Sequence, residues 1–510
     1  MIEKKLSSLL TGVEHQIAGG SPDAIVTSAA YDSRECSPGC VFFCVPGYSV
    51  DGHDFAPEAI SRGAAALVVE RDVQAPPDVA VIKTPDARLA MALISAAFYG
   101  LPSSKIKLAG VTGTNGKTSV AYLIDALHRQ AGIASGLIGT VENRVADVSL
   151  KVKRTTPESM DLQALLAMMA DKGVERAVME VSSHALKLSR VAGCEFSSAI
   201  FTNLTRDHLD FHKDEEDYFE AKRLLFSEHL AEGGPALLNS DDPMSARVAK
   251  TPGLRVVRYA VDDPEAEVRA IGAKHAHDGI SYRIESPFAA AFEVRTKLMG
   301  GFNAYNTLAM AAYGLTAGFS PEDIQAALAN FKGVPGRFER VDAGGPVGVY
   351  VDYAHTPHGL ENILKSAREI CKGRLIAVFG CGGDRDKTKR ALMGGIAAEL
   401  ADVVWVTNDN PRTEEPHRII DQITLGIEQA LIKLDRSRQF RYHVEQDRFA
   451  AIKRAIACAA PGDVVVIAGK GHETEQIYKD RVIHFDDREV AGNILREMAG
   501  SGVDADCEAD

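Results

Sequence analysis

The stretch IKLAGV-TGTNGKTS, residues 106–119, decides the fold class of this 510-residue chain. Its first six residues form a short apolar run of the kind that makes a buried strand. Beyond the stretch, apolar residues recur at helical spacing, at Val120, Leu123, Ile124 and Leu127. The glycine-rich segment therefore joins a strand to the N-terminus of a helix, which is typical of parallel α/β folds.

The same segment has the residues that a triphosphate requires. Glycines let backbone N–H groups approach the phosphates, the Lys117 ammonium neutralises charge, and the Thr118 hydroxyl suits Mg²⁺. Val111 stands where the general phosphate-loop pattern has its first glycine, so the alternative is a glycine-rich turn with a chance lysine. We predict that ATP is bound by Gly113, Thr114, Asn115, Gly116, Lys117, Thr118 and Ser119.

Three apolar runs near the other end of the chain predict a second parallel sheet. They are LIAVFG, VVWVT and VVVIAG, at residues 375–380, 403–407 and 464–469. Between the two predicted sheets, glycines and a proline around Pro335 interrupt both periodicities, which indicates a domain boundary near residue 333.

The sequence thus predicts an α/β protein of three domains. We expect a central P-loop-type ATPase sheet, a C-terminal doubly wound Rossmann-like sheet and a smaller α/β N-terminal domain. The predicted ranges are 1–102 for the N-terminal domain, 103–333 for the central domain, 334–500 for the C-terminal domain and 501–510 for a flexible acidic tail.

Composition narrows the class of protein. A net charge of −13 disfavours a passive nucleic-acid binder, because phosphate backbones require clustered lysine and arginine. We find no signal-peptide pattern and no apolar run of transmembrane length, so we expect a cytoplasmic protein without membrane insertion. The eight cysteines are scattered, which fits a reducing compartment. Cys36, Cys40 and Cys44 are evenly spaced, but they run into an apolar stretch and we expect no metal there.

A series of short motifs follows the phosphate loop in a fixed order. They are TTP at 155–157, EVSSH at 180–184, TNLTRDHLD at 202–210, AKRLLF at 221–226, GFNAYN at 301–306, GRFE at 336–339 and DYAHTP at 352–357. Together with GTNGKT, they resemble the Mur ligases and the related folylpolyglutamate synthases. The resemblance implies an ATP-dependent ligase that activates a substrate carboxylate as an acyl phosphate, which an incoming amine then attacks.

By this resemblance, Thr118, Glu180 and His208 bind Mg²⁺. Glu180 and His208 also stand at or near the ends of predicted strands, the usual place for ligands in open α/β sheets. The alternative for His208 is a histidine packed in the core, which Asp207 and Asp210 beside it disfavour.

Lys222, in YFEAKRLLF, is predicted from helical spacing alone to be a solvated surface lysine. The resemblance instead implies that it is carbamylated and helps to position a second Mg²⁺. With Lys117 and His208 it would make up the catalytic set. Such a reaction needs charge neutralisation and positioning more than a covalent nucleophile, so the absence of a nucleophilic triad motif is expected.

The resemblance implies further ATP contacts on both sides of the predicted boundary. Asn303 and Asn306 would flank the adenine. Arg337 and Asp352 would reach ATP only when the domains close, so domain movement is expected to be part of the cycle.

Three loops after the C-terminal strands are expected to meet at one edge of their parallel sheet, where ligands bind. The loop at 409–412 reads D-N-P-R, as in family members that add diaminopimelate, whereas lysine-adding members usually lack the arginine. Diaminopimelate has one more carboxylate than lysine, and a guanidinium suits it. The alternative for Arg412 is a residue that caps a turn. The predicted diaminopimelate-binding residues are Arg385, Asp409, Asn410, Pro411, Arg412, Gly469 and Glu473.

For the nucleotide-sugar substrate, the resemblance implies binding by Ser33, Thr155, Thr156, Ser182 and Arg190, with UDP on the N-terminal domain. Arg154 and Leu188 depart from the residues usual in the family. The implied substrates are UDP-MurNAc-L-Ala-D-Glu, meso-diaminopimelate and ATP, with Mg²⁺ as the metal ion. We expect the enzyme to be a monomer. Alternatives are a lysine-adding ligase, a folylpolyglutamate synthase and a non-enzymatic nucleotide sensor. The sensor would have no need of the predicted catalytic lysines and metal ligands.

Overall fold

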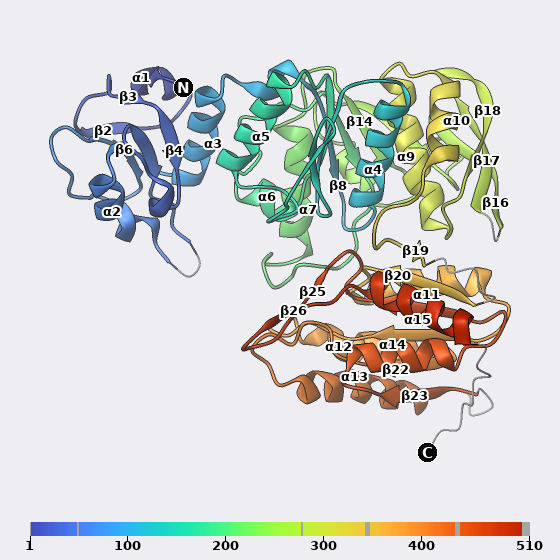
Figure 1. Ribbon diagram of the computed structural model, residues 1–510. Coiled ribbons are helices and arrows are strands. Elements are labelled where there is room, and N and C mark those ends of the chain that lie inside the picture. The colour runs from blue at the N-terminus through green and yellow to red at the C-terminus, as the bar shows by residue number, and fades with distance from the viewer. Residues whose placement is uncertain (1, 48–49, 277–278, 342–346, 434–438, 502–510) are drawn as a thin grey trace.

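The structure is a computed structural model that describes residues 2–47, 50–276, 279–341, 347–433 and 439–501. Three open sheets follow one another along the chain, each with helices packed on it (Figure 1). From residue 502 on, the predicted acidic tail lies outside the described residues. The α/β fold class predicted from the phosphate-loop stretch is confirmed.

The first sheet has the order β2-β7-β6-β5-β4 and is parallel except for β2 at one edge. Its strands are β2 (Gln16–Gly19), β4 (Ser28–Ala30), β5 (Cys40–Phe43), β6 (Ala64–Val69) and β7 (Ala80–Lys83). A short ribbon joins β1 (Lys4–Lys5) to β3 (Ile25–Val26). The α-helices of this part are α1 (Leu6–Leu9), α2 (Ala56–Ser61) and α3 (Ala87–Phe98).

The central sheet has the order β11-β10-β9-β12-β8-β13-β14-β15-β16-β17-β18. It is parallel from β9 to β16 and antiparallel at both ends. The parallel strands are β8 (Lys107–Thr112), β9 (Ser135–Ile138), β12 (Arg176–Glu180), β13 (Ser198–Phe201), β14 (Pro235–Asn239), β15 (Arg255–Ala260) and β16 (Val268–Ala276). The end strands are β10 (Asn143–Val145), β11 (Val148–Leu150), β17 (Gly279–Ser286) and β18 (Ala289–Thr296).

Helices cover both faces of the central sheet (Figure 1). They are α4 (Lys117–Gln130), α5 (Ser159–Asp171), α6 (Ser183–Lys187), α7 (Glu215–Ser227), α8 (Ser245–Val248), α9 (Phe302–Thr316) and α10 (Pro321–Asn330). The helix predicted after the phosphate loop is α4, and it packs against α9, α10 and the sheet. Its four periodic apolar residues are fully buried, so the core anchors this helix and the loop before it.

The C-terminal sheet has the order β19-β20-β24-β21-β22-β23, and β19 alone is antiparallel. Its strands are β19 (Glu339–Arg340), β20 (Gly348–Asp352), β21 (Leu375–Phe379), β22 (Val403–Val406), β23 (Arg441–Val444) and β24 (Val464–Ala468). Its helices are α11 (Pro357–Ile370), α12 (Thr388–Leu400), α13 (Pro416–Leu431), α14 (Arg448–Ala457) and α15 (Asp487–Ser501), and a hairpin joins β25 (Glu475–Ile477) to β26 (Val482–His484). The three apolar runs predicted as strands are β21, β22 and β24, all fully buried as a doubly covered parallel sheet requires.

Among the described helices, none is both long enough and apolar enough to cross a lipid bilayer.

Candidate active site

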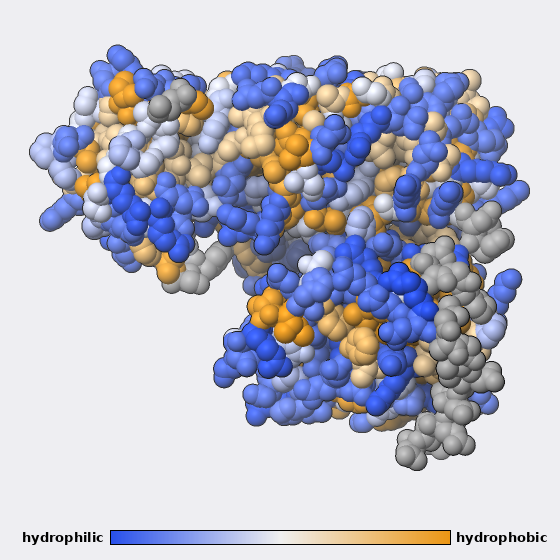
Figure 2. All heavy atoms as spheres, in the orientation of Figure 1, coloured by the Kyte–Doolittle hydropathy of each residue, from blue (hydrophilic) through white to orange (hydrophobic). Residues whose placement is uncertain are grey.

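Two sheet edges face each other across a cleft. The strands β12, β8 and β13 are parallel neighbours, so their carboxyl ends share one edge of the central sheet. The carboxyl ends of β20, β24, β21 and β22 share one edge of the C-terminal sheet for the same reason. A cleft of about 660 Å³ opens between loops from these edges, and the surface is hollowed there (Figure 2). Open α/β sheets bind ligands at such edges, so the cleft is the candidate active site.

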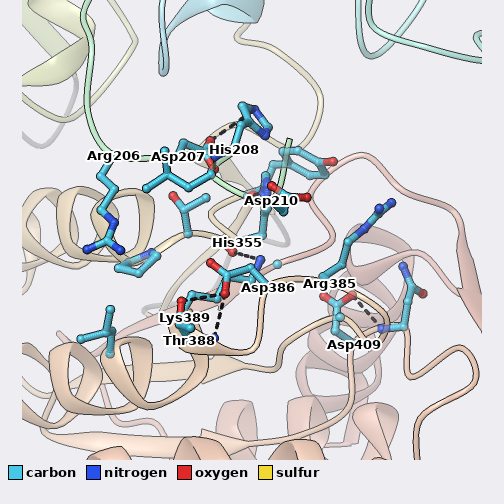
Figure 3. Close-up of a pocket in the computed structure, with 18 of the residues that line it drawn as sticks. Arg206, Asp207, His208, Asp210, His355, Arg385, Asp386, Thr388, Lys389 and Asp409 are labelled. Atoms are coloured by element: carbon cyan, nitrogen blue, oxygen red, sulfur yellow. Dashed lines mark hydrogen bonds and ion pairs between the residues drawn. The ribbon is translucent and has the colours of Figure 1, made fainter. Parts of the chain in front are cut away.

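Both parts of the molecule line the cleft with charged side chains (Figure 3). The central part contributes His184, Arg206, Asp207, His208, Leu209 and Asp210. The C-terminal part contributes Tyr353, His355, Thr356, Pro357, Gly382, Arg385, Asp386, Thr388, Lys389, Leu392, Asp409, Asn410, Arg412, Gly469 and Glu473. Acids and bases are interspersed, which suits a ligand that carries charges of both signs.

The phosphate loop leads from β8 into α4, as predicted. Gly116 has a φ of 86°, in the left-handed region, and a β-carbon there would lie 2.5 Å from Asn306 Oδ1. Two ammonium groups meet one carbonyl of the loop, because Lys117 Nζ and Lys222 Nζ donate to Gly113 O at 2.9 and 2.8 Å. Two amine-bearing side chains beside the N-terminus of a buried helix make a site suited to a polyanion.

Lys222 is 1% exposed, so the prediction of a solvated surface lysine is wrong. It shares one face of α7 with Phe219 and Phe226, and this face packs into the protein instead of facing solvent. Burial lowers the pKa of Lys222 well below its usual value, and the neighbouring Lys117 lowers it further. Its Nζ lies 4.5 Å from the ring centroid of Tyr218.

Glu180 ends β12 and is 1% exposed beside the phosphate loop. Its carboxylate accepts from Thr118 Oγ1 at 2.9 Å, and from the Thr140 N and Oγ1 at 2.7 and 3.0 Å. Carboxylate and hydroxyl oxygens fit Mg²⁺, which is often held by one or two carboxylates together with substrate phosphates. Within the described chain, no three His, Cys, Asp or Glu side chains are placed to hold a metal by themselves.

His208 lies at the cleft in the loop after β13, with a left-handed φ of 55°. Its ring packs edge-on against His184 at 4.9 Å between centroids, and its Nε2 lies 3.4 Å from Asp207 Oδ2. Burial lowers the pKa of His208 to about 4 although Asp207 opposes the shift, so the ring is neutral near pH 7. Glu180 ends β12 and His208 lies in the loop after β13, and both strands pair with β8, so the two predicted metal ligands stand at the same edge of the central sheet.

The other predicted ATP residues lie around the same loop. Asn306 donates to Asn303 Oδ1 at 2.9 Å on the first turns of α9. Arg337 NH2 donates to Thr118 Oγ1 at 3.2 Å, so it reaches the loop here without further closure, which differs from our expectation. Asp352 instead accepts backbone N–H groups of Phe338 and Ala354, both at 2.7 Å, and stays buried at the end of β20.

Of the predicted diaminopimelate residues, all but Pro411 line the cleft. Glu473 Oε2 accepts from Asn410 Nδ2 at 2.9 Å and from Lys470 Nζ at 3.2 Å. Arg412 NH1 donates to Gly383 O at 2.8 Å, and Arg412 has no ion-pair partner in the described part of the chain. Its guanidinium is therefore available for a ligand carboxylate.

The residues predicted for the nucleotide-sugar substrate divide into two groups. Thr156 Oγ1 donates to Ser182 Oγ at 3.3 Å, and Arg190 donates to Thr156 O at 3.3 Å. Thr155 Oγ1 lies 3.1 Å from Thr140 Oγ1, which in turn bonds the Glu180 carboxylate. Ser33 is apart, since it is buried in the first sheet's layer and donates to Glu58 Oε2 at 2.7 Å.

Several residues at the site were not predicted. Thr140 follows β9 and bonds Glu180, and the apolar run GLIG before it was the available signal. Lys470 is fully buried and donates to Asn410 Oδ1 at 3.1 Å as well as to Glu473. It stands in the loop that follows β24, one of the three loops expected at this sheet edge, but spacing alone did not distinguish it from a surface lysine.

Comparison with known proteins agrees with the three sheets. Family models described as "Mur ligase family, catalytic domain", "Mur ligase middle domain" and "Mur ligase, glutamate ligase domain" match residues 26–99, 111–314 and 336–471. A protein of Geobacillus kaustophilus named UDP-N-acetylmuramoyl-L-alanyl-D-glutamate--2,6-diaminopimelate ligase is 47% identical over 485 residues, 94% of this chain and 96% of that protein. A Syntrophomonas wolfei protein of the same name is 44% identical over 96% of this chain and 99% of its own.

Solved structures give the same picture. One titled as a UDP-N-acetylmuramoyl-L-alanyl-D-glutamate--2,6-diaminopimelate ligase matches with a TM-score of 0.68 at 30% identity, over 95% of this chain and 97% of that chain. A Mycobacterium tuberculosis folylpolyglutamate synthase complexed with ADP matches with a TM-score of 0.59 at 20% identity, over 75% of this chain and 92% of its own. The second likeness concerns the fold alone.

Proposed function

The chain belongs to the Mur ligase family, and we propose that it joins meso-diaminopimelate to the D-glutamate of UDP-MurNAc-L-Ala-D-Glu in an ATP-dependent step of peptidoglycan precursor synthesis. The observation that carries this proposal is Arg412, which lines the cleft with no carboxylate paired to it in the described structure. Diaminopimelate differs from lysine by a carboxylate at its far end, and a guanidinium binds a carboxylate through two parallel hydrogen bonds.

In the proposed reaction, a substrate carboxylate oxygen attacks the γ-phosphorus of ATP and the bond to ADP breaks. The amine of diaminopimelate then attacks the acyl phosphate carbon, loses a proton and expels inorganic phosphate. Lys117 holds the transferring phosphoryl group, since its ammonium lies beside the loop at the helix N-terminus. Mg²⁺, held by Thr118, Glu180 and His208, would neutralise phosphate charge when bound.

Lys222 is proposed to be carbamylated. Carbamate formation requires a neutral amine that attacks CO₂ and loses a proton, and the lowered pKa of Lys222 favours the neutral form. The carbamate would supply oxygen ligands beside the phosphate loop. Lys222→Ala should lose activity and regain part of it when a short carboxylic acid is added. No rescue, together with no added mass on the native lysine, would count against carbamylation.

The nucleotide-sugar end is proposed to contact Ser33, Thr155, Thr156, Ser182 and Arg190. Support comes from the cluster around Thr156, which lies between the central sheet and α5. We also propose the domain ranges 1–102, 103–333 and 334–500, a cytoplasmic location and a monomeric state.

The function is tested by the dependence of ADP release on substrates. Release should require both UDP-MurNAc-L-Ala-D-Glu and meso-diaminopimelate. Equal or better turnover with L-lysine would contradict the proposed specificity and favour the lysine-adding alternative. Turnover with a folate substrate would favour a folylpolyglutamate synthase, and no turnover with any pair would favour the nucleotide sensor.

A further inference from the structure

An ion pair between a fully buried arginine and a half-buried glutamate lies beside the loop that carries Arg412. Arg390, on α12, is 0% exposed, and its NH1 and NH2 donate to the two carboxylate oxygens of Glu414 at 3.0 and 2.9 Å. The same guanidinium donates to Gln422 Oε1 at 2.9 Å and to Gly382 O at 3.2 Å. A buried guanidinium is tolerated only when it is paired, so these partners fix one another in a single geometry.

Glu414 connects this pair to the neighbouring loop. Its Oε1 accepts the backbone N–H of Asp384 at 2.7 Å. The Asp384 carboxylate in turn accepts from Thr413 Oγ1 at 2.7 Å and from Thr413 N at 3.1 Å. Asp384 has a left-handed φ of 53°, which a non-glycine residue keeps only when its surroundings determine it.

The two loops also touch through their backbones. Gly383 N donates to Asn410 O at 2.8 Å, and a β-carbon on Gly383 would lie 1.8 Å from Pro411 O. Gly383 O is the acceptor for Arg412 NH1. On its other side, Arg412 N donates to Ile477 O at 3.0 Å with a left-handed φ of 54°. Arg412 is therefore held at its backbone and at its guanidinium.

We infer that Arg390 and Glu414 are positioning residues that hold the loop at 382–384, so that Gly383 O orients the Arg412 guanidinium and thereby sets the discrimination between diaminopimelate and lysine. The inference rests on the proposed function, in which Arg412 binds the distal carboxylate. A guanidinium donates two parallel hydrogen bonds to a carboxylate, and a fixed plane aligns both of them. The ion pair itself does not line the cleft, so it acts through Arg412.

Two variants test this role. Glu414→Gln keeps the size of the side chain but removes its charge, and Asp384→Ala cuts the next link at an exposed side chain. The matched control is Asp463→Asn, a buried acid at the opposite edge of the same sheet, which pairs with Arg374 at 2.7 Å. For each protein, kcat/KM for meso-diaminopimelate and L-lysine, KM for ATP and the melting temperature are measured.

Both test variants should lower kcat/KM for meso-diaminopimelate about tenfold or more, as expected for a misplaced binding group. The kcat/KM for L-lysine and the KM for ATP should stay within about twofold of the wild-type values. Asp463→Asn should lower the melting temperature while it leaves the ratio of the two amines unchanged. If Glu414→Gln does not fold, Asp384→Ala alone decides.

The inference is overturned if both variants keep the wild-type ratio of kcat/KM for meso-diaminopimelate to kcat/KM for L-lysine. It is also overturned if kcat/KM falls equally for both amines, or if Asp463→Asn shifts the ratio as much. A wild type that does not prefer diaminopimelate overturns the proposed function first, and the positioning role with it. The two failures are therefore distinguishable.

Discussion

The phosphate loop, residues 113–118, and the amine-receptor loops, residues 381–386, 409–412 and 469–473, occupy equivalent edges of two parallel sheets but are built differently. The phosphate loop is one contiguous segment whose shape comes from glycines and backbone contacts. The amine-receptor loops come from three strands and are fixed by buried charged side chains such as Arg390 and Lys470. A phosphate chain presents the same charge in many directions, so the backbone of one segment can cradle it, whereas an amino acid must be recognised at several separate groups, which loops from three strands supply.

Substitution of one lysine in the phosphate loop should have the largest effect. Lys117→Ala removes an ammonium from the site of the transferring phosphoryl group, so kcat should fall by about 10²–10³-fold with every amine. Turnover is followed as ADP release, with circular dichroism to check folding. A kcat within tenfold of wild type would show that the loop does not stabilise the transferring group.

Arg412→Ala should have a smaller and more selective effect. Loss of a charge-assisted pair to the distal carboxylate corresponds to about 2–4 kcal/mol, or roughly 30- to 1,000-fold in kcat/KM for meso-diaminopimelate. L-Lysine lacks that carboxylate, so its kcat/KM should hardly change. The measurement is competition between the two amines, and a parallel loss for both would contradict the comparison between the two sites.

The phosphate-loop region was the easier one to predict from sequence. A strand, glycines, a lysine and a helix follow one another within residues 106–127, so local pattern sufficed for β8 and α4. Three strands of the C-terminal sheet were also accessible, because they are continuous apolar runs. Family resemblance added the ordered motifs that local pattern does not explain.

Burial and long-range pairing were not accessible in the same way. Lys222 reads as a surface residue because helical spacing does not reveal which face packs inward. Arg390 and Glu414 are 24 residues apart, and nothing in the sequence between them signals that they meet. Left-handed backbone at His208 and Arg412 depends on contacts that only the folded chain supplies.

The two regions should also differ in how pH affects their stability. His128, on α4, is fully buried, and burial lowers its pKa to about 3. The unfolded chain takes up a proton near pH 6.5, so stability falls as pH drops from about 6.5 toward 3, by at most about 1.4 kcal/mol per pH unit for this group.

The C-terminal region responds at lower pH. Hydrogen bonding to Arg390 holds the pKa of Glu414 near 2. The contribution of Glu414 to stability is therefore present above the unfolded value of about 4.5 and is lost as pH falls toward 2.

His128→Phe should therefore flatten the pH dependence of unfolding between pH 7 and 5, whereas Glu414→Gln should leave it unchanged in that window. Urea midpoints by circular dichroism measure the whole chain, and the emission of Trp405, the one tryptophan, follows the C-terminal sheet. If His128 is buried and neutral, its substitution should change the pH dependence of the urea midpoint measured by circular dichroism. The same slope in wild type and His128→Phe would contradict a neutral histidine at this position.

The smallest effects should come from a glycine-to-alanine substitution made once in each region. Gly116→Ala places a β-carbon 2.5 Å from Asn306 Oδ1 on a left-handed residue, which costs about 1–2 kcal/mol in the backbone alone and should raise KM for ATP. Gly382→Ala places it 3.0 Å from Arg412 NH1, a side-chain end that has to shift by only a few tenths of an ångström, so the expected change is about 0.5 kcal/mol and confined to KM for meso-diaminopimelate. If Gly382→Ala instead proved as costly as Gly116→Ala, the Arg412 guanidinium would be held as rigidly as the backbone. The two sites would then be built from different groups but would be equally rigid.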